Sequence, residues 1–343
     1  MPSILHDEIY EQPVVVQRLL ERELHNVQKD AADLRGTFDS ILIAARGTSD
    51  NAARYAQYLF GAHNRLPVGL ATPSLYTLYN QPPTLKRMLV IGISQSGQSP
   101  DIVSVLAEAK RQGQPTLAIT NDPASPLAQT AASTIALQTG PEKAVAATKT
   151  YTGQMLMFYL LAYALGGKIG IPDLERLPEA VEGALRLEPE IDALSERYRY
   201  MRHAVVVGRG LNYANAFELS LKLMETCYVV TERFSSADFM HGPIAMVEPS
   251  FPVFAFAPPD VTWPSLGGTL EKLKSLRAEI VAITDSGNRE VEARATRVIR
   301  LPRRLKPWFT PIPYIVPAQL FAAFLAAQKA SIRTTRAPCT RSH

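Results

Sequence analysis

The chain has 343 residues, 46% hydrophobic and 20% charged, which is the composition of a globular protein with room for two domains. Its formal net charge is +4, and no basic stripe interleaved with aromatic residues occurs, so we expect no nucleic-acid partner. The longest apolar stretch, near residues 155–165, is too short and too interrupted to span a bilayer, so we expect no membrane partner.

Cysteine usage and the N-terminal composition bear on the compartment. Cys227 and Cys339 lie far apart without metal-ligand spacing, which argues against a disulfide scaffold and fits a reducing environment. The first residues are acidic where a signal peptide needs a basic start and an apolar middle. The sequence therefore predicts a cytoplasmic protein.

Strand and helix patterns alternate through the first half of the chain. Residues 8–35 carry an amphipathic helical pattern. The predicted strands are residues 40–47, 88–95, 116–121 and 134–139, and the predicted helices are residues 48–65, 100–113 and 149–167. We expect Thr48, Ser49 and Asp50 to cap the first of these helices. Continuous apolar strands between helices are typical of a parallel sheet covered on both faces.

The same order of patterns returns after a polar helical linker at residues 174–199. HAVVVGRG (203–210), FPVFAFAP (251–258) and EIVAITD (279–285) correspond to the first, second and third strands of the first half. The two Arg-Gly pairs are 163 positions apart (209 − 46), and the two Ala-Ile-Thr triplets are 164 apart (282 − 118). This offset predicts an internal duplication, the alternative being chance matching of short apolar strings. We expect the basic cluster at residues 300–306 to be a solvated loop.

A polar turn, SQSGQS at residues 94–99, ends the second strand of the first half. Ser99 suits a helix N-cap and Pro100 the first helical position, so the turn presents backbone N–H groups, hydroxyls and the positive end of a helix dipole. The turn has no lysine and no nucleotide-triphosphate motif, and its donors suit a phosphate monoester. The alternative is that Ser99 only caps the helix. The corresponding turn in the second half reads APPD (257–260), so the fold itself does not need the serines.

The helix that follows Gly210 carries the candidate reactive groups. Glu218, Lys222 and Glu225 are spaced four and three apart and share one helix face. From spacing alone this is an exposed salt-bridged face, but the helix is otherwise mostly apolar, which favours a face turned to a pocket. His241 sits in a His-Gly-Pro turn before an apolar segment and is a candidate acid or base near neutral pH.

Five motifs resemble the sugar isomerase (SIS) domains: SQSGQS, VAATKT (145–150), GRG (208–210), ELSLKLMET (218–226) and MHGPIAM (240–246). More narrowly, they resemble the isomerase half of glutamine–fructose-6-phosphate aminotransferase and the SIS-type glucosamine-6-phosphate deaminases. EIYEQP (8–13) also resembles the start of that half. The resemblance implies an α/β fold of two tandem SIS domains, each a doubly wound, flavodoxin-like parallel sheet flanked by helices. It implies an N-terminal helical segment at 1–35, SIS domains at 36–175 and 190–330, and an atypical tail at 331–343.

The resemblance also implies the site residues. Those matched to phosphate or sugar contacts are Ser94, Gln95, Ser96, Ser99, Thr48, Ser49, Val145, Ala147 and Thr148. Glu225 matches the carboxylate that moves a proton between C1 and C2, Lys222 a lysine beside it, and His241 the ring-opening histidine. Because family members donate that histidine from the neighbouring subunit, a homodimer is implied.

The function implied is deamination of glucosamine 6-phosphate to fructose 6-phosphate and ammonia, without a metal or cofactor. Position 2 is Pro rather than a nucleophilic cysteine, so we expect no glutaminase activity. The tail lacks the family's lysine, since Lys329 lies too early, which bears on catalytic competence. The open alternatives are a fructosyl-amino-acid-phosphate deglycase, a ketose/aldose phosphate isomerase and a non-catalytic phosphosugar sensor.

Overall fold

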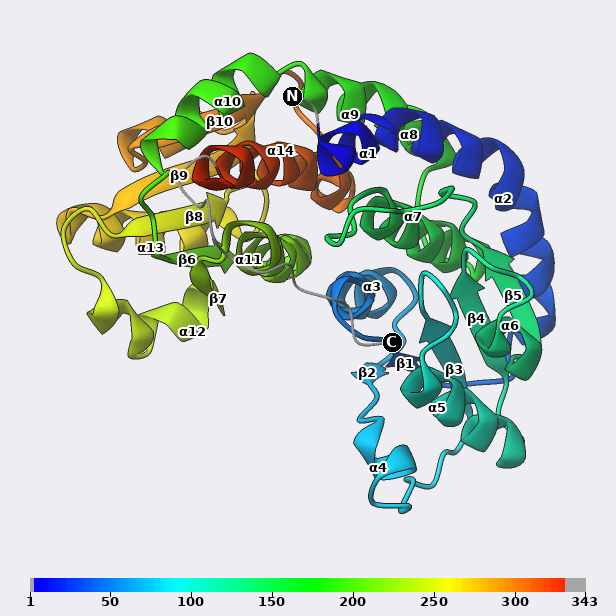
Figure 1. Cartoon of the computed structure of the whole chain (residues 1–343). Coiled ribbons are helices and arrows are strands. Elements are labelled where there is room, and N and C mark those ends of the chain that lie inside the picture. The colour runs from blue at the N-terminus through cyan, green and yellow to red at the C-terminus, as the bar shows by residue number, and fades with distance from the viewer. Residues whose placement is uncertain (1–2, 331–343) are drawn as a thin grey trace.

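The computed structural model describes residues 3–330 and contains two α/β halves joined by helices (Figure 1). Each half holds a parallel five-stranded sheet, ordered β2-β1-β3-β4-β5 in the first and β7-β6-β8-β9-β10 in the second. The first sheet comprises β1 (Ser40–Ala44), β2 (Val68–Leu70), β3 (Met88–Ile93), β4 (Thr116–Thr120) and β5 (Ser133–Ala136). The second comprises β6 (His203–Gly208), β7 (Val230–Ser235), β8 (Pro252–Phe256), β9 (Glu279–Asp285) and β10 (Arg297–Leu301). The identical strand order confirms the predicted doubly wound fold in two copies.

Helices cover both sheets and connect them. The N-terminal and first-half helices are α1 (Ile4–Tyr10), α2 (Gln12–Leu34), α3 (Thr48–His63), α4 (Ser74–Thr77), α5 (Pro100–Arg111), α6 (Pro126–Thr130) and α7 (Lys149–Ala164). The linker forms α8 (Ile171–Leu174), α9 (Leu177–Leu185) and α10 (Glu188–Arg197). The second half contributes α11 (Tyr213–Cys227), α12 (Ser236–Met240), α13 (Trp263–Ser275) and α14 (Pro311–Ala330). Four short 3₁₀ helices are η1 (Gly210–Asn212), η2 (Pro243–Met246), η3 (Glu290–Ala293) and η4 (Pro307–Phe309).

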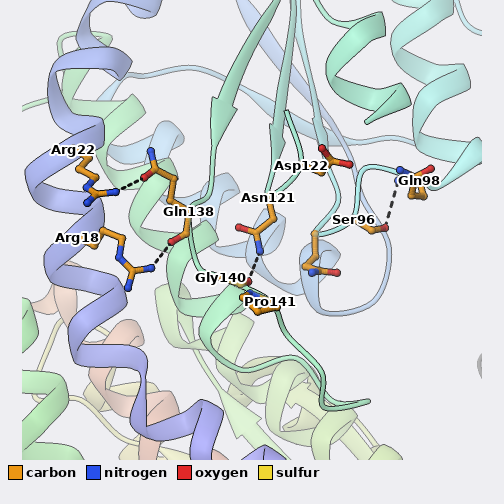
Figure 2. A pocket seen from close by; sticks show the side chains of 10 residues that line it. Arg18, Arg22, Ser96, Gln98, Asn121, Asp122, Gln138, Gly140 and Pro141 are labelled. Carbon is orange, nitrogen blue, oxygen red and sulfur yellow. Dashed lines mark hydrogen bonds between the residues drawn. The ribbon is translucent and has the colours of Figure 1, made fainter. Parts of the chain in front are cut away.

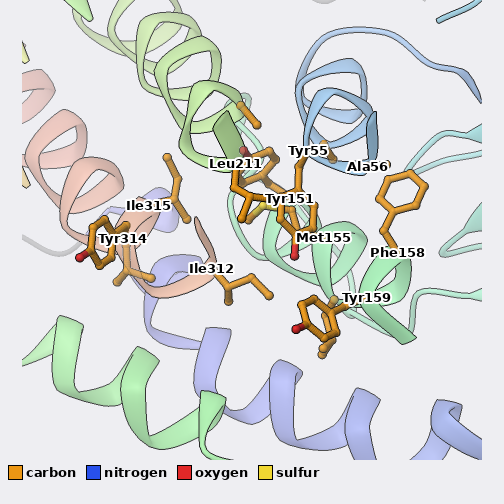
Figure 3. Packing of buried hydrophobic residues seen from close by; sticks show 14 of the residues in the cluster. Tyr55, Ala56, Tyr151, Met155, Phe158, Tyr159, Leu211, Ile312, Tyr314 and Ile315 are labelled. Carbon is orange, nitrogen blue, oxygen red and sulfur yellow. The ribbon is translucent and has the colours of Figure 1, made fainter. Parts of the chain in front are cut away.

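One hydrophobic core runs through both halves. Its largest cluster contains side chains from β1, β3 and β4 of the first sheet and from β6, β8 and β9 of the second. Between the sheets, Tyr55 of α3, Tyr151 and Tyr159 of α7, and Ile312 and Tyr314 of α14 lie close together (Figure 3). Two smaller clusters lie outside this one, one on the outer face of the first sheet and one on the outer face of the second. The halves are therefore packed into one body rather than tethered by the linker alone.

Helix α14 is the one helix within residues 3–330 that is long and apolar enough to cross a membrane. It packs against α9, α10 and α11, and 78% of its most apolar window is buried inside the protein. A helix in the centre of a globular core passes the same test of length and composition.

Several local predictions change in detail. The N-terminal segment is helical as predicted, but it forms two helices, because the chain turns at Glu11 and restarts with Pro13 near the start of α2. Helix α3 has Gly47 at its N-cap with no side-chain capping bond, so Thr48 is already helical. Of the predicted basic loop, Arg303, Arg304 and Lys306 are exposed in a loop as expected. Arg300 instead lies in strand β10 and donates to the backbone oxygens of Asp285 and Asn288. Its neighbours alternate buried and less buried, a strand pattern that the charges obscured.

Candidate functional site

The turns after β1 and β3 meet at one edge of the first sheet. The two strands pair in parallel, with Ala44 opposite Gly92, so their carboxyl ends lie side by side. Arg46, in the turn after β1, forms an ion pair and hydrogen bond with Asp101, in the first turn of α5. This hydrogen bond lowers the pKa of Asp101. The Arg46–Asp101 contact links the turn that precedes Thr48 with the helix that follows the serine turn.

The serine turn is fixed by its own hydroxyls and by the end of β4. Ser94 Oγ accepts a hydrogen bond from Gly97 N (3.1 Å), and Ser96 Oγ accepts from Gln98 N (3.4 Å). Asn121 N donates to Gln95 O at 3.1 Å. A hydroxyl has one donor and two acceptor positions, so Ser94 and Ser96 retain O–H donors for a ligand.

Gly97 makes this geometry possible. Its φ is +65°, in the left-handed region, and a Cβ placed on it would lie 2.1 Å from Ser125 Oγ. Ser99 occupies the N-cap of α5 as predicted, with Pro100 at the first helical position, but its side chain makes no capping bond. The serine turn thus presents the start of an uncapped twelve-residue helix.

The reactive face of α11 is buried against α3 of the first half. Glu218 is 0% exposed and Lys222 is 1% exposed, which rules out the alternative of a solvated salt-bridged face. Lys222 Nζ lies 2.9 Å from Glu225 Oε2 and 3.3 Å from Glu218 Oε1. It also donates to Thr48 Oγ1 at 3.2 Å. Lys222, which is matched to the reaction, therefore touches Thr48, which is matched to sugar contact, across the two halves.

Glu218 completes this cross-half cluster. Its two carboxylate oxygens accept hydrogen bonds from Thr48 Oγ1 (3.2 Å) and from Asn51 Nδ2 (2.8 Å), both on α3. Burial raises the pKa of Glu218, and the charge of Lys222 only partly offsets this. Burial lowers the pKa of Lys222, but the attraction of Glu218 and Glu225 outweighs it, so that the pKa is raised overall. Lys222 thus stays a cation between two carboxyl groups.

The third matched segment is a loop that leads into α7. Val145 is 56% exposed and Ala147 is partly buried, whereas Thr148 is fully buried. Thr148 N and Oγ1 both donate to Glu142 Oε1, at 2.6 and 3.3 Å, so these donors hold the loop closed. Ser49 Oγ accepts a hydrogen bond from Gln154 of α7 at 2.8 Å, which ties α3 to the same helix.

His241 lies apart from this cluster. It is exposed at the C-cap of α12, beyond strand β7, and its backbone N–H donates to Asp238 O. The segment after it is the short helix η2 rather than a strand, and the next strand, β8, begins only at Pro252. Among the described residues, no ion pair or hydrogen bond joins His241 to the α11 cluster, and its catalytic role stays a prediction.

A pocket of about 790 Å³ opens on the other side of the serine turn (Figure 2). It lies at the ends of β3, β4 and β5, whereas Thr48 follows β1 on the opposite side of β3. Its lining residues are Arg18, Arg22, Gln95, Ser96, Gln98, Asn121, Asp122, Gln138, Gly140 and Pro141. Arg18 and Arg22 of α2 donate to Gln138, as Figure 2 shows. The pocket therefore reaches the turn through Gln95, Ser96 and Gln98, on the side away from Thr48.

Sequence reasoning placed Glu218 on the right helix face but gave it no site role, and it missed Asn51 and Glu142. Asn51 lies three residues after Thr48, so a polar residue on the same helix face was the available signal. Glu142 carried no such signal, because its contact with Thr148 depends on the path of the loop.

Comparison with known proteins places the chain in a family. The model of the SIS domain matches residues 38–164 and 198–328, once in each half, so the chain belongs to the SIS domain family. The chain is 32% identical over 340 residues to a glutamine–fructose-6-phosphate aminotransferase from Caldanaerobacter subterraneus. That match covers 94% of this chain and 55% of the relative, so the chain spans about half the length of the curated relative.

Two solved structures share the whole fold. One is the C-terminal domain of glucosamine-fructose-6-phosphate aminotransferase from Francisella tularensis, with a TM-score of 0.88, 27% identity, and coverage of 96% of this chain and 97% of that chain. The other, from Silicibacter pomeroyi, is described as a proposed phosphosugar isomerase, with a TM-score of 0.84, 33% identity, and coverage of 96% and 98%.

Proposed function

We propose that the protein is a phosphosugar isomerase-type enzyme that acts as a glucosamine-6-phosphate deaminase, forming fructose 6-phosphate and ammonia. The observation that carries the proposal is the position of Lys222. Its ammonium bonds both Glu225 and Thr48, so the carboxylate of the second half lies at the edge of the first sheet that also bears the serine turn. A sugar held there by its phosphate would lie with its first carbons beside Glu225.

Each chemical step has a group suited to it. With the ring opened to the aldehyde, Glu225 removes the proton from C2 while the C1 oxygen takes a proton from solvent, giving an enolamine. The same carboxyl returns its proton to C1 while the nitrogen releases a proton to solvent, which leaves a hydroxyl at C1 and an imine at C2. Water then replaces the imine nitrogen to give the ketone and ammonia. A positioned acid or base contributes about 100- to 10,000-fold to such a proton transfer.

Charge balance at the cluster supports an amino sugar as the substrate. Two carboxyl groups, Glu218 and Glu225, surround one cation, Lys222. The net charge of these three side chains is −1 when both carboxyl groups are ionised. A C2 ammonium is attracted to such a site more strongly than a C2 hydroxyl. Phosphate bound at the serine turn, away from the reacting carbons, supplies orientation.

The exposed position of His241 supports a homodimer in which this histidine reaches the partner's site. Met240 and Met246, on either side of it, are 42% and 44% exposed, and Val230 on the edge strand β7 is 62% exposed. Exposed apolar side chains and an edge strand each suit a protein partner. The expected cytoplasmic location is consistent with this function, because hexose phosphates are present in the cytoplasm.

The test is incubation of the pure protein with glucosamine 6-phosphate, assayed for ammonia and fructose 6-phosphate. Wild-type protein is expected to release both, and Glu225→Gln to lose about 100-fold or more of kcat while still binding the substrate. Binding without turnover by wild-type protein would instead indicate a sensor. Turnover of fructose 6-phosphate or of a fructosyl-amino-acid phosphate, without ammonia from glucosamine 6-phosphate, would select an isomerase or a deglycase.

Subunit mixing tests the assignment of His241. Glu225→Gln and His241→Asn proteins, each inactive, are unfolded and refolded together. If His241 acts across the dimer, hybrids regain one intact site and activity returns. No recovery above the separate variants, in samples shown by light scattering to be dimeric, would place His241 in its own subunit's site or outside catalysis.

A further inference from the structure

Within the loop between β5 and α7, the segment Lys143–Thr148 is tied at both ends by carboxylates. At its start, Glu8 accepts hydrogen bonds from Lys143 N (2.5 Å) and Ala144 N (3.1 Å). At its end, Glu142 accepts from Thr148 N (2.6 Å). The loop therefore has a defined path although it contains no helix or strand. Charge-assisted hydrogen bonds of this kind are shorter and stronger than neutral ones.

Glu8 comes from a distant part of the chain. It lies on α1, 135 positions before Lys143, and is 3% exposed. A buried carboxylate is unfavourable unless its oxygens are satisfied, and here both are satisfied by the loop's amides. One explanation would be that Glu8 merely neutralises the buried Lys149. Glu11 already does so, since its Oε2 lies 2.6 Å from Lys149 Nζ whereas Glu8 Oε1 lies 4.0 Å away.

Gln12 extends the attachment from the loop to the helix behind it. Gln12 accepts a hydrogen bond from Thr152 Oγ1 of α7 and donates to Gln319 Oε1 of α14 at 2.8 Å. The start of the chain thus fixes both the loop and the first turns of α7. Tyr151 in those turns bonds Asn215 of α11 (3.0 Å), so the same helix also contacts the element that carries Lys222 and Glu225.

We propose that Glu8 is a positioning residue for the sugar phosphate site: its carboxylate holds the segment Lys143–Thr148, and with it Val145 and Ala147, in the geometry that binds the sugar. This inference rests on the proposed function. On this proposal, α1 contributes to sugar binding only by holding the loop. The proposal also gives a structural role to Glu8, the first residue of the EIYEQP segment.

Limited trypsin digestion reads the state of the loop without any substrate. Lys143 is exposed, and cleavage after it breaks the peptide bond whose nitrogen donates to Glu8. Glu8→Gln keeps the shape but presents an N–H where a loop amide needs an acceptor, so cleavage after Lys143 should speed up about tenfold or more. Glu142→Gln loosens the other end and should act in the same direction. Glu11→Gln, which pairs with Lys149 but touches no loop amide, is the matched control and should change the rate less than about twofold.

Kinetics then show whether the loop serves the site. For Glu8→Gln we expect KM for glucosamine 6-phosphate to rise about tenfold with kcat within about threefold, as for loss of binding common to ground and transition states. In wild-type protein, glucosamine 6-phosphate should slow cleavage after Lys143. Glu11→Gln should show the wild-type KM.

The outcomes separate the two proposals. Unchanged cleavage in Glu8→Gln and Glu142→Gln would show that these carboxylates do not hold the segment Lys143–Thr148. Faster cleavage with an unchanged KM would show that the segment has no role in binding the sugar phosphate. If wild-type protein neither binds nor converts glucosamine 6-phosphate, fructose 6-phosphate or a fructosyl-amino-acid phosphate, the proposed function fails and the site role with it. The ratio of the cleavage rates of Glu8→Gln and Glu11→Gln would still decide whether Glu8 holds the segment Lys143–Thr148.

Discussion

The two halves share one strand order but differ in the chemistry at the carboxyl ends of their strands. After β3 the first half presents hydroxyls and the start of α5. After β8 the second half presents Asp260, whose Oδ1 accepts from Thr262 N (2.7 Å) and so satisfies its own turn. A second carboxylate, Asp285, is buried at the end of β9. We therefore expect an anion to bind at the first edge rather than at the second.

The helices that follow the first strand of each half are also used differently. Helix α3 follows β1 and offers Thr48 and Asn51, whereas α11 follows β6 and offers two carboxyl groups and a lysine. These two helices pack on each other. Duplication therefore supplied two copies of a scaffold, and the candidate site draws residues from both.

The largest expected effect comes from removing the cation of the second half. Lys222→Met leaves Glu218 buried without its partner, and we expect a loss of about 3–5 kcal/mol in the free energy of unfolding, measured by urea denaturation. The double variant Glu218→Gln/Lys222→Met should be less destabilised than Lys222→Met. Lys149→Met is the first-half comparison, because Lys149 is equally buried but pairs closely with the 52% exposed Glu11. Equal losses for Lys149→Met and Lys222→Met would contradict this distinction.

Next in size is the effect of a side chain in the serine turn. Gly97→Ala meets both a left-handed backbone and the contact with Ser125, and should cost about 2–4 kcal/mol of stability along with phosphate affinity. Gly113→Ala has a similar φ (+72°) but open space around it, and should cost only about 1–2 kcal/mol. Thermal unfolding with and without glucosamine 6-phosphate separates the two effects. A Gly97→Ala protein as stable as Gly113→Ala would show that the turn tolerates movement.

The tyrosines between the halves should make the protein sensitive to alkali. Burial raises the pKa of Tyr55, Tyr151 and Tyr314 well above the usual value of 10.0. Above pH 10 the unfolded chain loses these protons while the native state keeps them, so stability falls as pH rises, by up to about 1.4 kcal/mol per pH unit for each tyrosine. Urea midpoints measured from pH 9 to 11, beside phenolate absorbance, check this. Ionisation of all 13 tyrosines at full native signal would contradict it.

The smallest effect compares single hydroxyls at the two edges. Ser96→Ala in the first half removes one donor to the phosphate and should raise KM about fivefold, as for one hydrogen bond of about 1 kcal/mol. Ser265→Ala, near the start of α13 in the second half, is the matched control and should leave KM unchanged. Equal effects of the two changes would remove the functional distinction between the two edges.

Much of the fold could be predicted because its strands are continuous apolar runs. Strands β1, β3, β4, β6, β8 and β9 all lie within the predicted strand segments. Three edge strands were missed: β2 (Val68–Leu70) is only three residues long, and β7 (Val230–Ser235) and β10 (Arg297–Leu301) mix polar and apolar residues. Such strands are recognised by their partners rather than by their own composition.

At the site, helical spacing was enough to group Lys222 with Glu225, because residues three apart on one helix are neighbours wherever the helix lies. The contact between Lys222 and Thr48 could not be predicted from the sequence. The two residues are 174 positions apart, and only packing between the halves brings them together. The contribution of His241 to a partner's site stays a prediction. The tail at 331–343, and the question of its lysine, falls outside the described residues.

The core shared by the two sheets has a consequence for engineering. Cutting the chain in the linker between α7 and β6 would separate Tyr151 and Tyr159 from their neighbours on α14. Each fragment would then expose a large hydrophobic surface. Neither piece should be expressed as an independent module, and thermal melting should be a single cooperative event despite the doubled architecture.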